Sequence, residues 1–395
     1  MSINGIRDKF INLLLFLVNL SIIYSFNTFY FDGNRRGQIV SLVIIVVSFL
    51  TMWGLKPSVL IDKKIFTLFL IYIAIAIIII IKSDFSWYSI FMMGLAFPCC
   101  MFFMYYIICE NYFKLFITIF CNIVVVIAII SIFFWLFGSI LHIIQPSALV
   151  YSKWSNQFVA SYYNLYFQPQ NADYTILNFT VNVRNSAIFL ESPMATYIFG
   201  VSIIINELFI KKKFVRVILL IALISTADTT AIIFFIIYMI YIITMYTDLK
   251  LNSIWGIVAL ILIISVIPIF IKVLQSKASS GLSLSIRINH IIQECKAFLL
   301  SPIYGQGFNE FTNGSSNSIF ALSADGGILL WGIYYFPLFS ILKKSIKSMK
   351  IIILLFIILF AITVVQYTLF TYMIISFVWI ILNSNLKLQQ KYLGE

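Results

Sequence analysis

Long apolar runs dominate this chain and limit what it can fold into. Residues 351–383 contain no charged side chain, and about 20 apolar residues are enough for a helix to cross a bilayer. Over all 395 residues, 62% are hydrophobic and 10% are charged, whereas about a quarter of the residues in soluble domains are charged. These properties exclude a water-soluble globular enzyme and predict an all-α polytopic membrane protein.

The apolar runs predict a single integral membrane domain over residues 1–395. Twelve transmembrane helices are expected, at residues 10–30, 39–55, 65–81, 87–109, 115–137, 187–210, 214–226, 229–247, 253–272, 317–342, 351–366 and 367–383. Polar residues divide the uncharged run at 366–368 and the run 214–247 at 226–230. The first run is too long for a signal-peptide core and lacks a cleavage site of small residues, so we expect it to be retained as a span.

The distribution of charge predicts how the spans are oriented. With the N-terminus in the cytoplasm, 17 of the 26 lysines and arginines fall on the cytoplasmic side. Basic residues concentrate in the cytoplasmic loops of membrane proteins, so both termini are expected in the cytoplasm. The formal charge of +12 is then mainly a signal of topology, and no nucleic-acid partner is expected.

Two long polar segments separate groups of spans. Residues 138–186 are rich in Asn, Gln, Ser and Tyr, and residues 275–316 are rich in Ser, Gly and Asn. Both fall on the outer side, so we expect two large periplasmic loops that carry the chemistry of the protein. The chain has no visible internal repeat, unlike transporters built from similar halves. Its five cysteines lack the spacing of a zinc site, and no metal is expected.

The first loop ends with a pair of opposite charges. Arg184 lies at the predicted membrane surface, and Glu191 follows one to two turns into the sixth expected span. A carboxylate at membrane depth costs roughly 2.5–3.5 kcal/mol unless it faces protein or water. Glu191 is therefore expected to be paired or catalytic, with Arg184 as its nearest partner. The alternative is a structural ion pair that steadies the start of the helix.

The second loop contains a predicted amphipathic helix over Ser285–Leu299. At about 100° per residue, Arg287, His290 and Glu294 fall on one face. The opposite face carries Ile288, Ile292, Cys295 and Leu299. We expect this helix to lie along the outer membrane surface with its polar face turned to a cavity. The Arg287 guanidinium suits bidentate binding of a diphosphate, whereas His290 is either a chemical group or an ordinary solvated residue.

Further candidates follow this helix. Gly305 and Gly307 form a pattern that fits either a binding loop or an ordinary turn. Asn317 opens the tenth expected span, where free N–H groups would attract an anion; the alternative is a simple N-cap. Asp325 lies about two turns further on, and Asp228 lies between two short central helices. Either acid can be a structural partner of an arginine.

These motifs resemble the signature of the O-antigen ligase and polymerase (Wzy-type) superfamily. The residues that carry the likeness are Arg287 and His290, the turn Pro302-x-x-Gly305-x-Gly307, Asn317, and Asp325-x-Gly327. Arg184, Glu191 and Pro193 resemble the family's other loop motif, an arginine followed by Glu-Pro, although Ser192 separates Glu191 from Pro193 here. Ser316-Asn317 stands where ligase-like members have His-Asn.

The resemblance implies a C-type glycosyltransferase-like fold that uses an undecaprenyl-diphosphate-linked oligosaccharide, without a cofactor or a metal. It implies that the catalytic residues are Glu191, His290, Arg184 and Arg287. Glu191 is the first choice of base and His290 the second. The residues implied to bind the diphosphate and sugars are Arg184, Arg287, Gly305, Gly307, Asn317 and Asp325.

The resemblance favours an O-antigen polymerase, a glycosyltransferase of lipopolysaccharide biosynthesis in the bacterial inner membrane. Such an enzyme joins oligosaccharide repeat units with inversion at the anomeric carbon, and capsule or exopolysaccharide polymerases share the pattern. The first alternative is an O-antigen ligase, which transfers polymer to the lipid A core; the missing His-Asn pair counts against it. The second is a lipid-linked oligosaccharide flippase or other transporter. Membrane lipids and a chain-length regulator are further expected partners.

Overall fold

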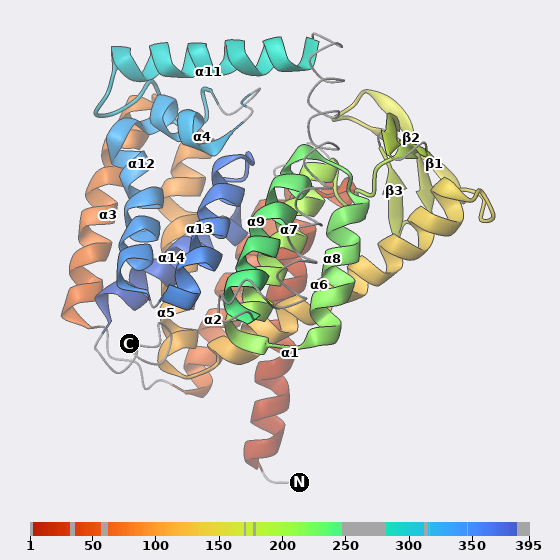
Figure 1. The fold of residues 1–395 in the computed structure, drawn as a ribbon. Helices are drawn as coiled ribbons and strands as arrows, with labels where there is room; N and C mark the ends of the chain where they lie inside the picture. The colour runs from red at the N-terminus through yellow and green to blue at the C-terminus, as the bar shows by residue number, and fades with distance from the viewer. Residues whose placement is uncertain are drawn as a thin grey trace.

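A computed structural model shows a bundle of helices with a lobe of short strands beside one end (Figure 1). The structure describes residues 3–31, 36–56, 62–169, 171–176, 179–246, 282–311, 315, 317–345 and 347–384. The expected span 253–272 lies outside the described residues. The remaining eleven expected spans coincide with helices or helical segments.

Six helical segments in the described residues are long and apolar enough to cross a membrane, as a polytopic membrane protein requires. They are α2 (Arg36–Leu55), α3 (Lys63–Lys82), α4 with α5 (Trp87–Ser89 and Phe97–Cys109), α6 (Phe113–Phe134, extended to Ile140), α7 (Ser192–Ile205, extended to Ile210) and α12 (Ser318–Lys344). The other helices are α1 (Ile3–Tyr24), α8 (Lys213–Ser225), α9 (Thr229–Tyr246), α11 (Leu282–Leu300), α13 (Lys347–Ala361) and α14 (Leu369–Asn383).

Polar residues divide the long apolar runs by capping the helices that follow. Asp228 precedes α9, and its Oδ1 accepts a hydrogen bond from the Ala231 N–H at 2.6 Å. Thr368 precedes α14, and its Oγ1 accepts from the Thr371 N–H at 3.2 Å. Each side chain satisfies a backbone donor that the first helical turn leaves free. Both expected divisions of the apolar runs are therefore present.

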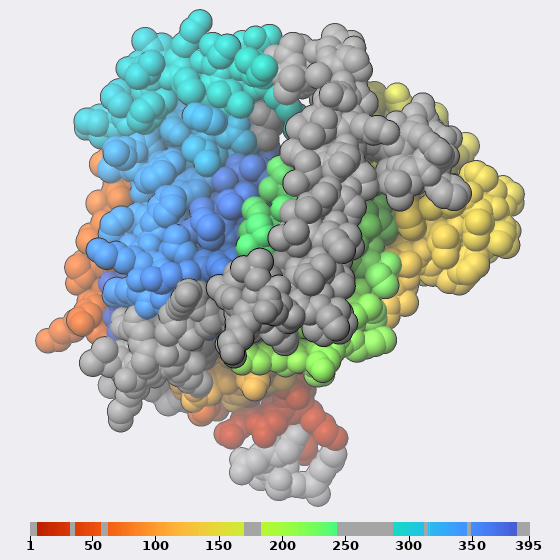
Figure 2. Space-filling model, in the orientation of Figure 1, coloured from red at the N-terminus to blue at the C-terminus, as the bar shows by residue number. Residues whose placement is uncertain are grey.

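The first long loop forms strands, which we did not expect in this chain. β1 (Ala148–Ser152), β2 (Gln157–Tyr162) and β3 (Tyr166–Gln168) form an antiparallel sheet in that order. β4 (Asn171–Ile176) and β5 (Phe179–Val183) form a separate hairpin. In Figure 2 the sheet β1–β3 projects from the side of the helical body, in yellow. The all-α expectation therefore applies to the helical bundle, and the first loop departs from it.

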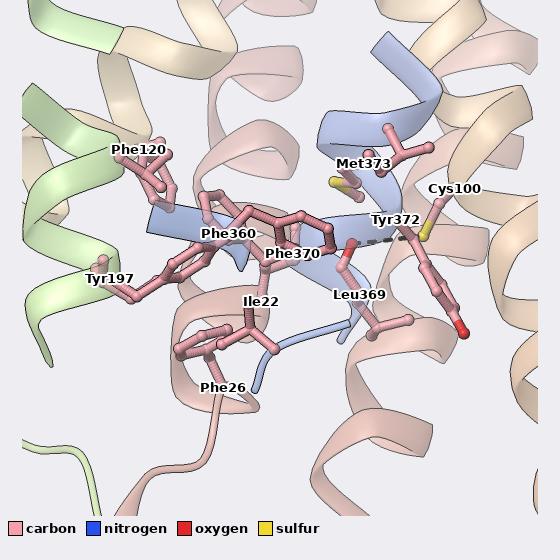
Figure 3. Packing of buried hydrophobic residues seen from close by; sticks show 14 of the residues in the cluster. Ile22, Phe26, Cys100, Phe120, Tyr197, Phe360, Leu369, Phe370, Tyr372 and Met373 are labelled. Carbon is pink, nitrogen blue, oxygen red and sulfur yellow. Dashed lines mark hydrogen bonds between the residues drawn. The ribbon is translucent and has the colours of Figure 1, made fainter. Parts of the chain in front are cut away.

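One aromatic cluster joins helices that are far apart in the sequence (Figure 3). The Phe26 ring stacks on Tyr197 of α7 with centroids 5.6 Å apart, and Phe370 of α14 stacks on Phe120 of α6 at 4.9 Å. Cys100 Sγ of α5 donates to Leu369 O at 3.9 Å. These contacts hold the segment after α1 against α7, and α14 against α5 and α6. The loops that follow α1 and precede α7 and α14 form the site.

The two ends of the bundle differ in chemistry. We call the end that carries α11 and the strand lobe the loop end; in Figure 1 α11 lies across it. Basic residues gather at the opposite end, where Lys56 pairs with Glu110. There Arg216 Nε and Nη2 donate to Glu207 at 2.6 and 2.7 Å. Because Glu207 is buried, this bidentate pairing offsets the cost of removing its charge from water.

Candidate functional site

A cavity of about 440 Å³ lies at the loop end of the bundle. Its walls come from segments far apart in the sequence, and they include Asn27, Trp154, Glu191, Arg287, Tyr367 and Thr368. The volume lies within the range of roughly 300–1,000 Å³ common for small-molecule sites. The cavity therefore brings together two of the expected catalytic residues, Glu191 from the first loop and Arg287 from the second.

Glu191 occupies the residue before α7 and has an extended backbone, with φ −143° and ψ 152°. We expected it one to two turns inside the span, and this placement was wrong. The backbone of the preceding apolar residues pairs with the segment after α1 instead: the Leu190 N–H donates to Asn27 O at 2.9 Å and the Phe29 N–H to Ile188 O at 3.1 Å. Glu191 consequently lies at the mouth of the bundle, where its carboxylate lines the cavity.

A tryptophan from the strand lobe orients the Glu191 carboxylate. The Trp154 Nε1–H donates to Glu191 Oε1 at 2.7 Å. Trp154 lies in the turn between β1 and β2, and it lines the same cavity. A hydrogen bond to a charged acceptor is stronger than one between neutral groups. We did not identify Trp154 from the sequence, although a tryptophan in the polar turn Ser-Lys-Trp-Ser-Asn was an available signal.

Hydrogen bonds of the next residue hold the backbone at Arg184 in place. The buried neighbour Asn185 donates through Nδ2 to Ser131 Oγ at 3.2 Å and to Ser225 Oγ at 2.8 Å. Its own N–H donates to Ser225 O at 3.1 Å. These bonds attach the end of the first loop to α6 and α8. The Arg184 side chain is half-buried. Its backbone position is fixed by the bonds that its neighbour Asn185 makes to α6 and α8.

Three charged side chains influence Arg184 at this end of the bundle. Burial lowers the pKa of the Arg184 guanidinium; the charge of Asp228 raises it, that of Arg287 lowers it and that of Glu191 raises it. The acids that favour the charged form of Arg184 are therefore Asp228 and Glu191. Through these charges Arg184 is electrostatically connected with two residues of the cavity wall, Glu191 and Arg287.

Asp228 supports this cluster from within the bundle. Its side chain is buried, and Oδ2 accepts a hydrogen bond from Thr196 Oγ1 at 2.7 Å. Thr196 belongs to α7, the helix that begins beside Glu191. Asp228 therefore connects the start of α9 with α7, while its charge stabilises the positive charge of Arg184.

The other sequence candidates, Arg184 among them, do not line this cavity. His290 lies three residues beyond Arg287 on α11, half-exposed. Gly305 and Gly307 form a turn that packs against α12: the Gln306 N–H donates to Ala324 O at 2.8 Å and the Gly307 N–H to Asp325 O at 3.0 Å. Asn317 has the geometry of an N-cap, since its Oδ1 accepts from the Phe320 N–H at 2.9 Å.

Asp325 is fully buried behind the cavity wall. Its Oδ1 accepts from the Phe311 N–H at 2.8 Å and its Oδ2 from the Tyr367 hydroxyl at 2.9 Å. Tyr367 lines the cavity, so Asp325 acts on the cavity through this tyrosine. Within the described residues, no group of three His, Cys, Asp or Glu side chains is arranged to hold a metal ion.

Glu294 is the buried acid of α11 and its side chain is 2% exposed. Burial raises the pKa of this carboxyl from 4.5 to about 7; the Ser315 side chain lowers it, the nearby charge of Asp325 raises it, and Asn317 lowers it. The folded protein therefore binds a proton at Glu294 between pH 4.5 and about 7, where the unfolded chain has lost it. The contribution of Glu294 to stability falls as the pH rises through this window.

Glu294→Gln is expected to stabilise the protein at pH 8 but not at pH 4.5, because the amide cannot ionise. A shift from 4.5 to about 7 corresponds to at most about 3 kcal/mol. The measurement is the melting temperature in detergent across this pH range. Glu310→Gln, at an exposed carboxyl, is the control and should change little. An equal shift of the Glu294→Gln protein at both pH values would contradict the assignment.

This chain matches no family model, no curated protein and no solved structure. We therefore infer its function from the geometry of the cavity and from the sequence motifs that supply its residues.

Proposed function

We propose that the protein is a polysaccharide polymerase, most simply an O-antigen polymerase of a bacterial inner membrane. It joins oligosaccharide repeat units carried on undecaprenyl diphosphate, as the resemblance to the Wzy-type superfamily implies. The growing chain leaves its lipid diphosphate and is transferred to a sugar hydroxyl of another lipid-linked unit. The fold of a helical membrane bundle with a polar cavity at one end is compatible with a substrate that is part lipid and part sugar.

One observation carries this proposal: the cavity at the loop end unites Glu191 and Arg287 from two separate loops, and the charges of both residues affect the pKa of Arg184. A diphosphate leaving group gains negative charge as its bond to the sugar breaks. Guanidinium groups already in place for that charge stabilise the transition state, most strongly where water is partly excluded. Arg184 and Arg287 are the residues to which we assign this role.

Glu191 is our choice of general base. In the proposed step, the acceptor hydroxyl attacks the anomeric carbon, a new C–O bond forms, and the C–O bond to the diphosphate breaks. The hydroxyl proton passes to the Glu191 carboxylate, which acts within hydrogen-bond reach of the acceptor. The Trp154 N–H at 2.7 Å holds one carboxylate oxygen, so the carboxylate is pre-oriented. His290 lies outside the cavity wall, and the geometry favours Glu191 over it.

A strain that lacks this protein tests the proposal, through the lipopolysaccharide bands it shows on a gel. For a polymerase, we expect lipid A core bearing a single repeat unit, with the ladder restored by a plasmid copy. Rough core with polymer retained on the lipid carrier would indicate a ligase. Rough core with repeat units trapped inside the cell would indicate a flippase. A normal ladder together with normal capsule and exopolysaccharide would refute all three.

A further inference from the structure

The β1–β2 hairpin exposes an unusual amount of aromatic surface. Phe158 is 69% exposed, Trp154 58% and Tyr151 49%. Tyr151 and Phe158 lie opposite each other in the strand register, with ring centroids 5.4 Å apart. Water contact with apolar rings is unfavourable, and a contiguous exposed apolar patch commonly marks an interaction site. We call these three residues the hairpin platform.

The opposite face of the hairpin attaches the platform to the site. Val150 and Val159 pack on a small core formed with Phe29, Phe167 and Leu190. Phe29 and Phe167 stack with centroids 4.5 Å apart. Leu190 immediately precedes Glu191, so the same packing that holds the hairpin also holds the backbone of the cavity carboxylate. The platform is therefore a fixed extension of the cavity wall.

Trp154 links the platform to the cavity. Its indole N–H is engaged by Glu191 Oε1 at 2.7 Å, while more than half of its surface stays exposed. The ring is thus held by one edge, and Tyr151 and Phe158 follow it along the strands. Trp154 lies in the turn that joins the strands of Tyr151 and Phe158, so the platform extends from the cavity onto the hairpin.

We propose that the hairpin platform binds the sugar rings of the oligosaccharide as they extend out of the cavity, which rests on the proposed function. One face of a pyranose presents C–H groups, and its rim presents hydroxyls. An aromatic ring can cover the C–H face while the hydroxyls stay hydrated, and Tyr and Trp are suited to surfaces that are apolar on one side and wet on the other. Asn156 and Gln157 supply amide donors and acceptors beside the rings.

The charge of the hairpin favours sugar over lipid as the occupant. Segments that bind membrane surfaces combine apolar residues with several lysines or arginines. Lys153 is the only basic residue in the sequence from 148 to 162. The hydrogen bond from Trp154 to the Glu191 carboxylate also places the platform beside the cavity, where the sugars would extend, which favours sugar over the bilayer as its partner.

Saturation-transfer NMR on the full-length protein in detergent tests the proposal. The probe is the oligosaccharide repeat unit released by mild acid from the polysaccharide of the same strain. Irradiation of aromatic protons should transfer saturation to the sugar C–H protons of the wild type. Trp154→Ala and the double variant Tyr151→Ser/Phe158→Ser should each bind the probe roughly tenfold more weakly. Trp154→Phe keeps the ring without the N–H and should retain binding.

Tyr163→Ser is the matched control, because Tyr163 is 64% exposed in the same lobe but lies in the turn between β2 and β3. Equal binding by all variants, or no binding by the wild type, would overturn the proposal. Broadening of a 5-fluorotryptophan signal at position 154 by nitroxide-headgroup lipids, without response to sugar, would also overturn it and identify a membrane anchor. A normal ladder together with normal capsule and exopolysaccharide in the deletion strain would refute the polymerase function alone, whereas sugar binding that depends on the platform would still stand.

Discussion

Arg184→Ala and Arg287→Ala are each expected to abolish the polysaccharide ladder and leave core with one repeat unit. Arg287 lines the cavity and its charge affects the pKa of Arg184, and both arginines are assigned to the departing diphosphate. Loss of one pre-oriented donor to a developing negative charge lowers the rate roughly 100- to 1,000-fold. The measurement is the lipopolysaccharide ladder of the deletion strain carrying each variant, with the amount of protein in the membrane determined by immunoblot.

Two further variants separate diphosphate binding from general charge effects. Arg184→Lys and Arg287→Lys keep the charge but lose the planar fork that binds two phosphate oxygens, so they should also shorten the ladder. Lys296→Ala removes an exposed positive charge from α11, the helix of Arg287, and should leave the ladder intact. Wild-type ladders from both alanine variants would refute the assigned role. Absence of the Arg184→Ala protein from the membrane would instead indicate that Arg184 is needed to balance Asp228.

The membrane helices could be predicted because their apolar runs are long and end at polar or charged residues. α9 begins at Thr229, as expected, because Asp228 caps it. The amphipathic helix α11, Leu282–Leu300, covers the expected 285–299 for a similar reason, since its periodicity extends over several turns. In these segments local sequence and membrane burial favour the same structure, so tertiary contacts do not override the pattern.

The strand lobe could not be predicted by the same approach. β1 to β5 have three to six residues each, too few for a clear alternation of apolar and polar residues. The sheet also packs on Phe29 of the segment after α1, more than a hundred residues away in sequence. Ala187–Leu190 is apolar, as the first turn of a span would be, yet it forms a buried non-helical turn whose backbone bonds to the segment after α1.

The site was predicted in part for a related reason. The cost of a charge at membrane depth pointed to Glu191, with Arg184 as its nearest partner, and the polar face of the amphipathic helix pointed to Arg287. The structure places Glu191 and Arg287 on one cavity wall, and their charges affect the pKa of Arg184. The same cost pointed to Asp325, but the partners of Asp325 come from residues 311 and 367. Sequence spacing shows that a buried acid needs partners, and only the fold shows which partners it has.

Gly327→Ala is expected to disrupt the loop end of the bundle. Gly327 interrupts the helical geometry of α12 with φ 60° and ψ −156°, a combination that is available essentially to glycine alone and costs other residues about 1–3 kcal/mol. A Cβ at this position would lie 2.7 Å from Pro302 O and would overlap the Ile303 carbonyl. Those carbonyls accept hydrogen bonds from the Ile328 and Leu329 N–H groups at 2.9 and 3.4 Å. We therefore expect a strongly reduced melting temperature in detergent.

Gly332→Ala provides the matched control, because Gly332 lies five residues further along the same helix and a Cβ there would meet no atom within 4 Å. Alanine also favours the helix over glycine by about 1 kcal/mol, so this variant should be as stable as the wild type or slightly more so. Equal melting temperatures of the Gly327→Ala and Gly332→Ala proteins would show that the turn at 302–307 does not pack against α12 as described. A difference between the two variants would show that Gly327 is needed where the turn packs against α12. Gly305 is needed at the same contact, because a Cβ there would overlap the α12 backbone at Asp325. This contact supports the cavity wall, since Asp325 accepts a hydrogen bond from Tyr367.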